Sequence, residues 1–260
     1  MISERLCRLA LWALAAMTAA GSCTAWVAGQ EPDPYGAAGA ADEGHEIHIP
    51  EPMVFDLVRG LGARRGEFET NVLALIPLDG ADDRPIEWAP EVEYAVAEGI
   101  ALEFELGFED THLEAYKLAA QYTFGTALDH HFIHGAQGIV ERFDGMDLWE
   151  YSLLYVPGFR FNRTWSALMM IGVRTESGGD SEDHTEGLFN VAVFADLSYN
   201  LSVGVESNVA SDMHGDTEVL LWPQLHWEID DHFMLQVGAG ADFRADETDA
   251  SFVFRFIYSR

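Results

Sequence analysis

From residue 66 onward, apolar and polar residues alternate with a period of two through one segment after another. In IALEFELGF, residues 100–108, every second residue from Ile100 on is large and apolar, and Glu103 and Glu105 lie between them. An extended strand places alternating side chains on opposite faces. Each such segment therefore forms a strand with one apolar and one polar face. This holds whether the apolar face contacts a protein core or lipid.

The length of these segments favours lipid. A tilted strand needs about 9–11 residues to cross about 30 Å of hydrocarbon, whereas strands of soluble domains have about five or six. The sequence thus predicts an all-β fold, a transmembrane antiparallel β-barrel of about twelve strands over residues 66–260. The predicted strands are 66–77, 91–98, 99–107, 114–124, 131–143, 149–161, 163–175, 187–198, 200–208, 217–229, 232–243 and 250–259.

The predicted connections alternate between long and short. Outer-membrane barrels have long loops at one end and tight turns at the other, and a β-sandwich with Greek-key crossings has no reason to keep that alternation. The long connections are 78–90, 108–113, 144–148, 176–186, 209–216 and 244–249, and the short ones lie near residues 98–99, 162, 199–200 and 230–231. Only 125–130 is longer than this alternation requires.

The last predicted strand carries a row of aromatic residues. Phe252, Phe254, Phe256 and Tyr258 share its outward face. This strand resembles the C-terminal strand of bacterial outer-membrane proteins, which the barrel-assembly machinery recognises. It departs from that pattern by ending in Arg260 instead of an aromatic residue. The assembly machinery is therefore an expected partner.

The N-terminal part of the chain is predicted to lead into the barrel. Residues 1–25 have the positive and apolar regions of a signal peptide, and both cysteines of the chain, Cys7 and Cys23, lie within them. Residues 26–52 are rich in Gly, Ala, Pro and acidic residues and are predicted to be a flexible leader. Residues 53–65 have apolar residues at helical spacing and are predicted to be a short helix or a lead-in segment. The expected location is the outer membrane of a Gram-negative-type bacterium.

The charge of the chain is strongly negative. Asp and Glu number 44 against 14 Lys and Arg, a formal net charge of -30, so nucleic acid is excluded as a partner. Inward-facing charges are predicted to line the lumen, where their field favours cations. The alternative is an ion-pair network that fills a closed lumen. The candidate lumen and selectivity residues are Glu67, Glu69, Glu91, Glu93, Glu103, Glu105, Lys117, Arg160, Arg174, Glu206, Glu218, Glu228, Asp242 and Arg255.

Metal and cofactor sites are not predicted. His130, His131 and His134 form the densest histidine group and are weak candidates for metal ligands, because no matching second cluster accompanies them. The acidic stretches 177–187 and 211–218 lack the spacing of a calcium loop. Divalent cations bound there would bridge to lipopolysaccharide, so outer-membrane lipid and lipopolysaccharide are expected partners.

Two stretches of the chain resemble a known group of barrels. EPMVFDLVRGLGARRGEFETNVLALIPL (51–78) and IEWAPEVEYAVAEGIALEFELGFEDTHLEAYKLAAQYTFGT (86–126) look like bacterial outer-membrane barrels of largely unassigned function. These are similar to the family named for the MetA pathway of phenol degradation, and some are labelled transporters. The resemblance implies a barrel of about twelve strands and the passage of small molecules, aromatic ones among them. It transfers no functional residue.

Three functions remain open. The first is a channel or uptake protein that passes small solutes, such as cations, neutral molecules or aromatic compounds, through an acidic lumen. The second is a plugged barrel with a structural or surface-binding role, which a lumen sealed by Arg–carboxylate pairs or by residues 29–65 would favour. The third is a barrel enzyme such as a lipid hydrolase, although the chain has no GxSxG, HExxH, GxGxxG or P-loop motif. We expect the chain not to be an enzyme.

Overall fold

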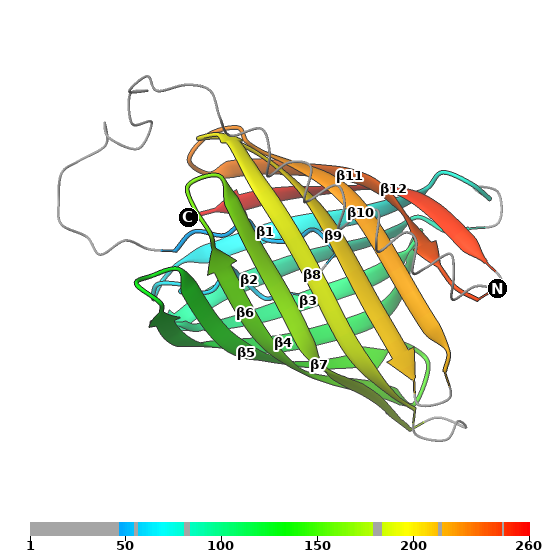
Figure 1. Cartoon of the computed structure of the whole chain (residues 1–260). Coiled ribbons are helices and arrows are strands. Elements are labelled where there is room, and N and C mark those ends of the chain that lie inside the picture. Colours follow the sequence, from blue (N-terminus) through cyan, green and yellow to red (C-terminus); the bar gives the residue numbers. More distant parts are fainter. Residues whose placement is uncertain (1–46, 55–56, 81–83, 179–183, 213–214, 246) are drawn as a thin grey trace. The chain divides into compact units, whose positions relative to one another are not determined.

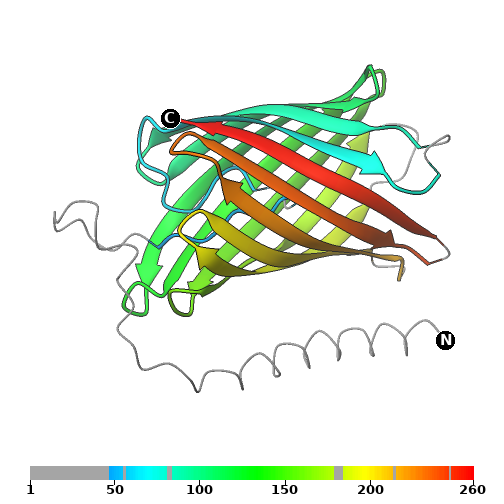
Figure 2. The ribbon, with the colours of Figure 1, turned by 90° about the horizontal axis from the view of Figure 1, so that it is seen from above.

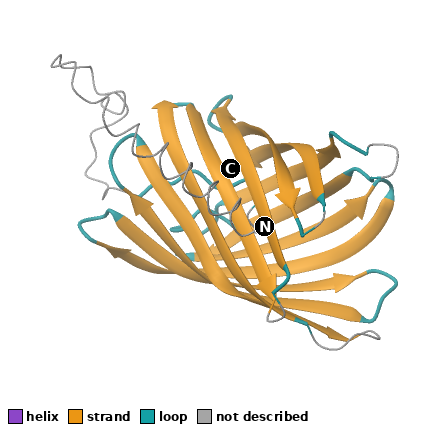
Figure 3. Ribbon diagram, turned by 45° about the vertical axis from the view of Figure 1, so that its right-hand side comes forward, coloured by secondary structure: helices purple, strands orange, loops and turns teal. Residues whose placement is uncertain are grey.

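The computed structural model describes residues 47–54, 57–80, 84–178, 184–212, 215–245 and 247–260. Within them, twelve antiparallel strands close into a barrel (Figure 1), and only strands and loops are seen (Figure 3). The predicted fold class and strand number are confirmed. The strands are β1 (Phe68–Pro77), β2 (Glu87–Ala97), β3 (Ile100–Glu109), β4 (His112–Ala127), β5 (Phe132–Phe143), β6 (Leu148–Arg160), β7 (Trp165–Gly178), β8 (Thr185–Ser198), β9 (Leu201–Asp212), β10 (Thr217–Glu228), β11 (Phe233–Phe243) and β12 (Thr248–Ser259).

The first and last strands close the barrel. β1 pairs with β12 over its whole length, with Val72 opposite Phe256, and every other strand pairs with its neighbours in sequence. Closure leaves no sheet edge, so the strands' N–H and C=O groups bond within the wall. A wall of this kind is one of the few structures that can span hydrocarbon, where no water is present to accept or donate a hydrogen bond.

The outer face of the wall is apolar. On β3, Leu102 and Phe104 each expose 45% of their surface, whereas Glu103 between them exposes 3%. The alternating pattern of residues 100–108 therefore directs the apolar side chains outward and the carboxylates into the lumen. The same holds around the barrel. Large exposed side chains of the wall include Val92, Tyr94, Leu118, Leu153, Val173, Phe189 and Val205.

The connections differ from the predicted alternation. We call the end of the barrel that carries Phe68 and Ser259 the terminal end, and the opposite end the loop end. At the loop end, β3 and β4 continue to Glu109 and His112, so the predicted long loop 108–113 is a tight turn at 110–111. Several strands extend beyond the predicted bounds because their alternating pattern continues through residues we expected in loops. The long connections of the loop end are 78–86 and 179–184.

Residues 47–54 and 57–65 are called the inner segment, and most of them lie inside the barrel (Figure 2). Val58 is fully buried, and Met53 and Leu57 nearly so. The described part of 53–65 contains turns and bends and no helix, so the short-helix alternative is wrong. Gly62 and Gly66 have φ angles of 94° and 96°, a left-handed conformation incompatible with a continuing helix. The described residues contain no helix long and apolar enough to cross a membrane.

Replacement of an outer-face leucine by lysine tests whether lipid or water surrounds the wall. Leu118 in the middle of β4 and Leu128 in the β4–β5 turn expose 60% and 66% of their surface. We expect Leu118→Lys to lower the free energy of unfolding in lipid vesicles by about 2 kcal/mol or more, as Lys does near the bilayer centre. Leu128→Lys serves as the control, with a change of about 0.5 kcal/mol or less. Equal effects, measured by urea unfolding, would contradict a lipid-facing wall.

Candidate functional site

The inner segment is held in the lumen by side chains of the wall. Met53 N donates to Glu206 Oε2 at 3.0 Å and lies 3.1 Å from Gln224 Oε1, and Val54 N donates to the same Glu206 oxygen at 3.1 Å. Glu206 is fully buried on β9. A segment without secondary structure needs such partners, because a buried N–H without one costs about 1–3 kcal/mol. Glu206 therefore acts as an anchor for the segment.

Residues 58–62 of the inner segment are hydrogen-bonded to the opposite side of the wall. Val58 N donates to Gln137 Oε1 at 2.9 Å, and Gly62 N donates to Thr123 Oγ1 at 2.9 Å. Gln121 Nε2 in turn donates to Arg59 O at 2.6 Å. These wall residues lie on β4 and β5, whereas Glu206 and Gln224 lie on β9 and β10. The segment therefore crosses between two sides of the lumen.

Apolar packing accompanies these hydrogen bonds. Leu57, Val58 and Ala63 pack against inward residues of β2 to β7, and Met53 packs against Trp222 and Val253. The inner face is therefore not polar throughout. At Gly158 the contact is so close that a Cβ would lie 2.7 Å from Ile49 Cδ1. Burial of each large side chain contributes about 1.5–3 kcal/mol, so the segment is a packed part of the barrel.

Arginines from the wall and from the inner segment pair with carboxylates of β1 and β2 and with Glu67, which directly precedes β1. Arg255 of β12 is buried and bonds Glu91, and it lies 3.4 Å from Glu93. Arg59 of the inner segment lies 3.3 Å from Glu67, 3.6 Å from Glu69 and 3.8 Å from Glu93. Burial of so many carboxylates requires cations nearby. The network thus ties the inner segment to the acidic wall.

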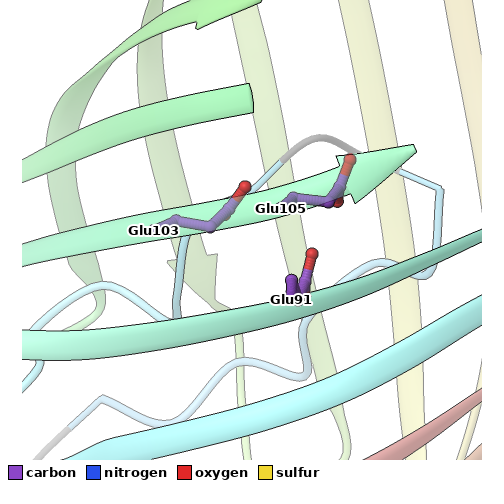
Figure 4. A group of neighbouring side chains, drawn as sticks. All are labelled: Glu91, Glu103 and Glu105. Atoms are coloured by element: carbon purple, nitrogen blue, oxygen red, sulfur yellow. The ribbon is translucent and has the colours of Figure 1, made fainter. Parts of the chain in front are cut away.

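The three carboxylates of Glu91, Glu103 and Glu105 point into one space. Figure 4 shows Glu103 and Glu105 on β3 and Glu91 on the neighbouring strand, and their oxygens lie within 4.8 Å of one another. Oxygen ligands of this kind suit a hard divalent cation. However, the Lys117 ammonium lies 3.1 Å from Glu103 and 2.9 Å from Glu105. A metal ion here would compete with a cation that the chain itself supplies.

Four more of the charged candidates, Arg160, Arg174, Glu218 and Asp242, form ion pairs on the inner side of the strands. Arg160 lies 2.5 Å from Asp196, and Arg174 lies 2.6 Å from Glu186. At the loop end, Arg244 lies 2.9 Å from Glu218 and 2.6 Å from Asp242. Its hydrogen bond to Glu218 raises the pKa of the Arg244 guanidinium. The fourteen predicted lumen residues thus face inward, several in ion pairs. Whether they select solutes remains a prediction.

The histidine group does not come together as a ligand set. His134 lies on the outer wall, 3.1 Å from Tyr155 Oη and beside the rings of Phe124 and Phe132. His131 contacts the carbonyl oxygen of Arg160. His134 and Tyr155 belong to an aromatic patch at the terminal end, where tyrosine and histidine suit the boundary between lipid and water.

The neutral residues that hold the inner segment were not among the predicted site residues. Gln121, Gln137, Gln224 and Gln236 face inward on four different strands and are each at least 95% buried. The only signal in the sequence was that glutamine recurs at inward positions, where a membrane barrel otherwise shows charged or small residues. Neutral amides suit this role because each can both donate to and accept from a backbone.

Cavities remain around the inner segment. One of about 380 Å³ opens beside it at the terminal end and is lined by Glu51, Arg59, Glu228 and Gln236 among others. Two smaller ones, about 270 and 230 Å³, border Val54 and residues nearer the loop end. Val54 lines both smaller cavities, and Leu57 lines the cavity at the terminal end and one of the smaller two. We call the part of the inner segment that carries Val54 and Leu57 its tip; it lies between the cavity at the terminal end and the two smaller cavities.

Removal of the buried arginine tests the ion-pair network. We expect Arg255→Met to lower the free energy of unfolding by about 3–5 kcal/mol, because Glu91 and Glu93 remain buried without it. Addition of Glu91→Gln should recover part of the loss. Arg244→Met, at an arginine that exposes 53% of its side chain, should cost about 1 kcal/mol or less. Urea unfolding in vesicles, followed by tryptophan fluorescence, measures both; similar losses would contradict a buried network.

The barrel is similar to solved porins and channels. A NanC porin matches with a TM-score of 0.60 and 9% identity over 73% of this chain and 98% of that chain. A KdgM porin in complex with oligogalacturonate gives 0.57 and 9% over 74% and 98%. An outer-membrane channel from Pseudomonas putida F1 gives 0.58 and 10% over 82% and 100%. At these identities the likeness concerns the fold.

Sequence comparison assigns the family. No curated protein matches the chain. The profile of the HAEPLYID-like family matches residues 45–259, which include the inner segment and all twelve strands. This match does not establish the resemblance to the family named for the MetA pathway. The chain belongs to the HAEPLYID-like family.

Proposed function

We propose that this protein is an outer-membrane channel for small solutes whose lumen is closed at rest by the inner segment. The observation that carries the proposal is the pair of open spaces on either side of the segment's tip. The segment pairs with no strand of the wall, so its displacement would leave the barrel's own hydrogen bonds intact. A single movable element thus lies between the two spaces.

The membrane location rests on the outer wall. An apolar belt of this extent on a protein in water would be an aggregation site, and in a bilayer it is the required surface. The fold of solved outer-membrane porins and channels supports the same location. The expected signal peptide, the barrel-assembly machinery and lipopolysaccharide belong to this proposal.

The charge of the lumen favours cations and neutral solutes. Glu69, Glu91, Glu93 and Glu103 outnumber the arginines and lysine around them, and rings of carboxylates favour cations in channels. A polyanion such as oligogalacturonate, present in one similar structure, would be repelled here. Apolar side chains that line the two smaller cavities offer a surface for aromatic solutes, as the MetA-pathway resemblance implies; they include Leu73, Ile139, Leu154, Met170 and Leu220.

A plugged barrel without transport is the second candidate, and the buried hydrogen bonds of the inner segment favour it. A serine hydrolase would need a serine beside a histidine. In the described lumen, Ser202 donates to Asp196 and His226 bonds Gln224, so that contact is not formed. The channel and the plugged barrel differ in whether the inner segment moves.

Conductance separates the channel from the plugged barrel. We expect the refolded mature protein in a planar bilayer to show brief, cation-selective openings. Val58→Pro removes the N–H that Gln137 accepts and leaves the wall unchanged, so the open time should increase severalfold.

Asn190→Ala is the matched control, because Asn190 lines a cavity without a hydrogen bond to the described part of the inner segment. It should leave the open time unchanged. A protein that inserts but stays silent, both as wild type and as Val58→Pro, would favour the plugged barrel and refute the channel.

A further inference from the structure

The cavity at the terminal end has the composition of a ligand site. We propose that it binds a small organic cation with several N–H donors, an alkyl amine or diamine. The proposal deepens the channel function above, on which its biological role rests, by naming a solute class. The cavity has a volume of about 380 Å³. It is therefore large enough for a molecule of several heavy atoms.

The charge of this cavity is the first observation. Its lining contains six carboxylates against one arginine: Glu51, Glu67, Glu69, Glu228, Asp230, Asp231 and Arg59. Arg59 is already engaged by Glu67 and Glu69. Within the described part of the chain, no arginine or lysine lies within ion-pair distance of Glu228 or Asp231; His48, which also lines the cavity, is the group that interacts electrostatically with Glu228. A cation from solution would therefore gain Coulomb energy here without displacing an arginine or a lysine.

The second observation is independent of the carboxylates and concerns a neutral amide. Gln236 is fully buried and lines the cavity, and its Nε2 donates to Glu51 O at 3.4 Å. Its Oε1 has no hydrogen-bond donor, and the same is true of Glu69 Oε1. Buried acceptors without donors are rare and costly. They indicate that a ligand here should supply N–H groups.

One donor in the cavity is also without a hydrogen bond, and it does not change this conclusion. Arg59 Nη1 lies 3.6 Å from Glu69 and 3.8 Å from Glu93, so its charge is matched within the protein. His226 donates through Nε2 to Gln224 Oε1 at 2.8 Å, which leaves its Nδ1 as an acceptor 3.5 Å from Gln236 Nε2. The polar groups not yet satisfied are thus mainly acceptors.

The remaining wall of the cavity is apolar. Ile47, Ile49 and Leu61 of the inner segment face the space together with Ile133 and Leu168 of the wall. Such a surface suits a hydrocarbon chain and not a hydrated inorganic ion, which would keep its water. Small-molecule sites combine apolar walls with a few polar groups in this way. Together, acidic groups, free acceptors and apolar walls specify an organic cation.

Calorimetric titration of the full mature protein in detergent tests the site. The probe is 1,4-diaminobutane, and the neutral isostere 1,4-butanediol is its control. We expect saturable binding of the diamine at one site and none of the diol. Glu228→Gln with Asp231→Asn should weaken binding about tenfold, a difference of about 1.4 kcal/mol. Glu247→Gln with Asp216→Asn neutralises the same residue types at the loop end and should change binding less than twofold.

A variant that binds the diamine more tightly is a second test of the site, because misfolding would not increase affinity. Asn200 lines the cavity, and its Oδ1 accepts a hydrogen bond that an aspartate would also accept. Asn200→Asp adds a carboxylate and should tighten diamine binding severalfold. No diamine binding, equal binding of the diol, equal losses in both double variants, or Ca²⁺ binding in place of the diamine would each overturn the proposal. Binding without conductance would refute the channel alone, and conductance without binding would refute this site alone.

Discussion

Closure of the β1–β12 seam is the constraint on which the rest of the structure depends. In hydrocarbon, a strand with an unpaired edge would leave a row of N–H and C=O groups without partners, each at a cost of several kcal/mol. The register in which Val72 lies opposite Phe256 removes that edge. Once the wall is closed, its outer face must be apolar, and polar residues are directed inward.

The side chains of an eight-stranded barrel just fill its interior. Because a barrel of twelve strands is wider, its own side chains cannot fill the interior completely. The inner segment occupies part of this space. Its backbone brings unpaired N–H groups into the lumen, and the wall meets them with Glu206, Gln137 and Thr123. The polar lining therefore has two roles in one place: it bonds the inner segment and it leaves an excess of negative charge beside it.

The barrel was predictable because a wall with lipid on one side imposes a strict period of two on each strand. That pattern identified twelve strands and directed Glu103, Lys117 and Arg255 inward. It did not predict how the inner segment lies in the lumen, because the apolar residues of 53–65 have helical spacing although the described part of that range forms no helix. Its partners, such as Gln121 and Gln224, are far apart in sequence and are neutral, so a search for charges passed over them. The predicted loop 108–113 failed because the alternation of β3 and β4 continues into it.

The hydrogen bond from Met53 to Gln224 has a consequence for folding kinetics. The two residues are separated by 171 positions, so the first part of the barrel region to be synthesised acquires its partner only when the tenth strand is in place. Contacts of such sequence separation form late, after the entropy of closing the long loop has been overcome. The seam that pairs Val72 with Phe256 joins residues still further apart in sequence, so closure of the wall and docking of the inner segment both belong to the last steps of folding.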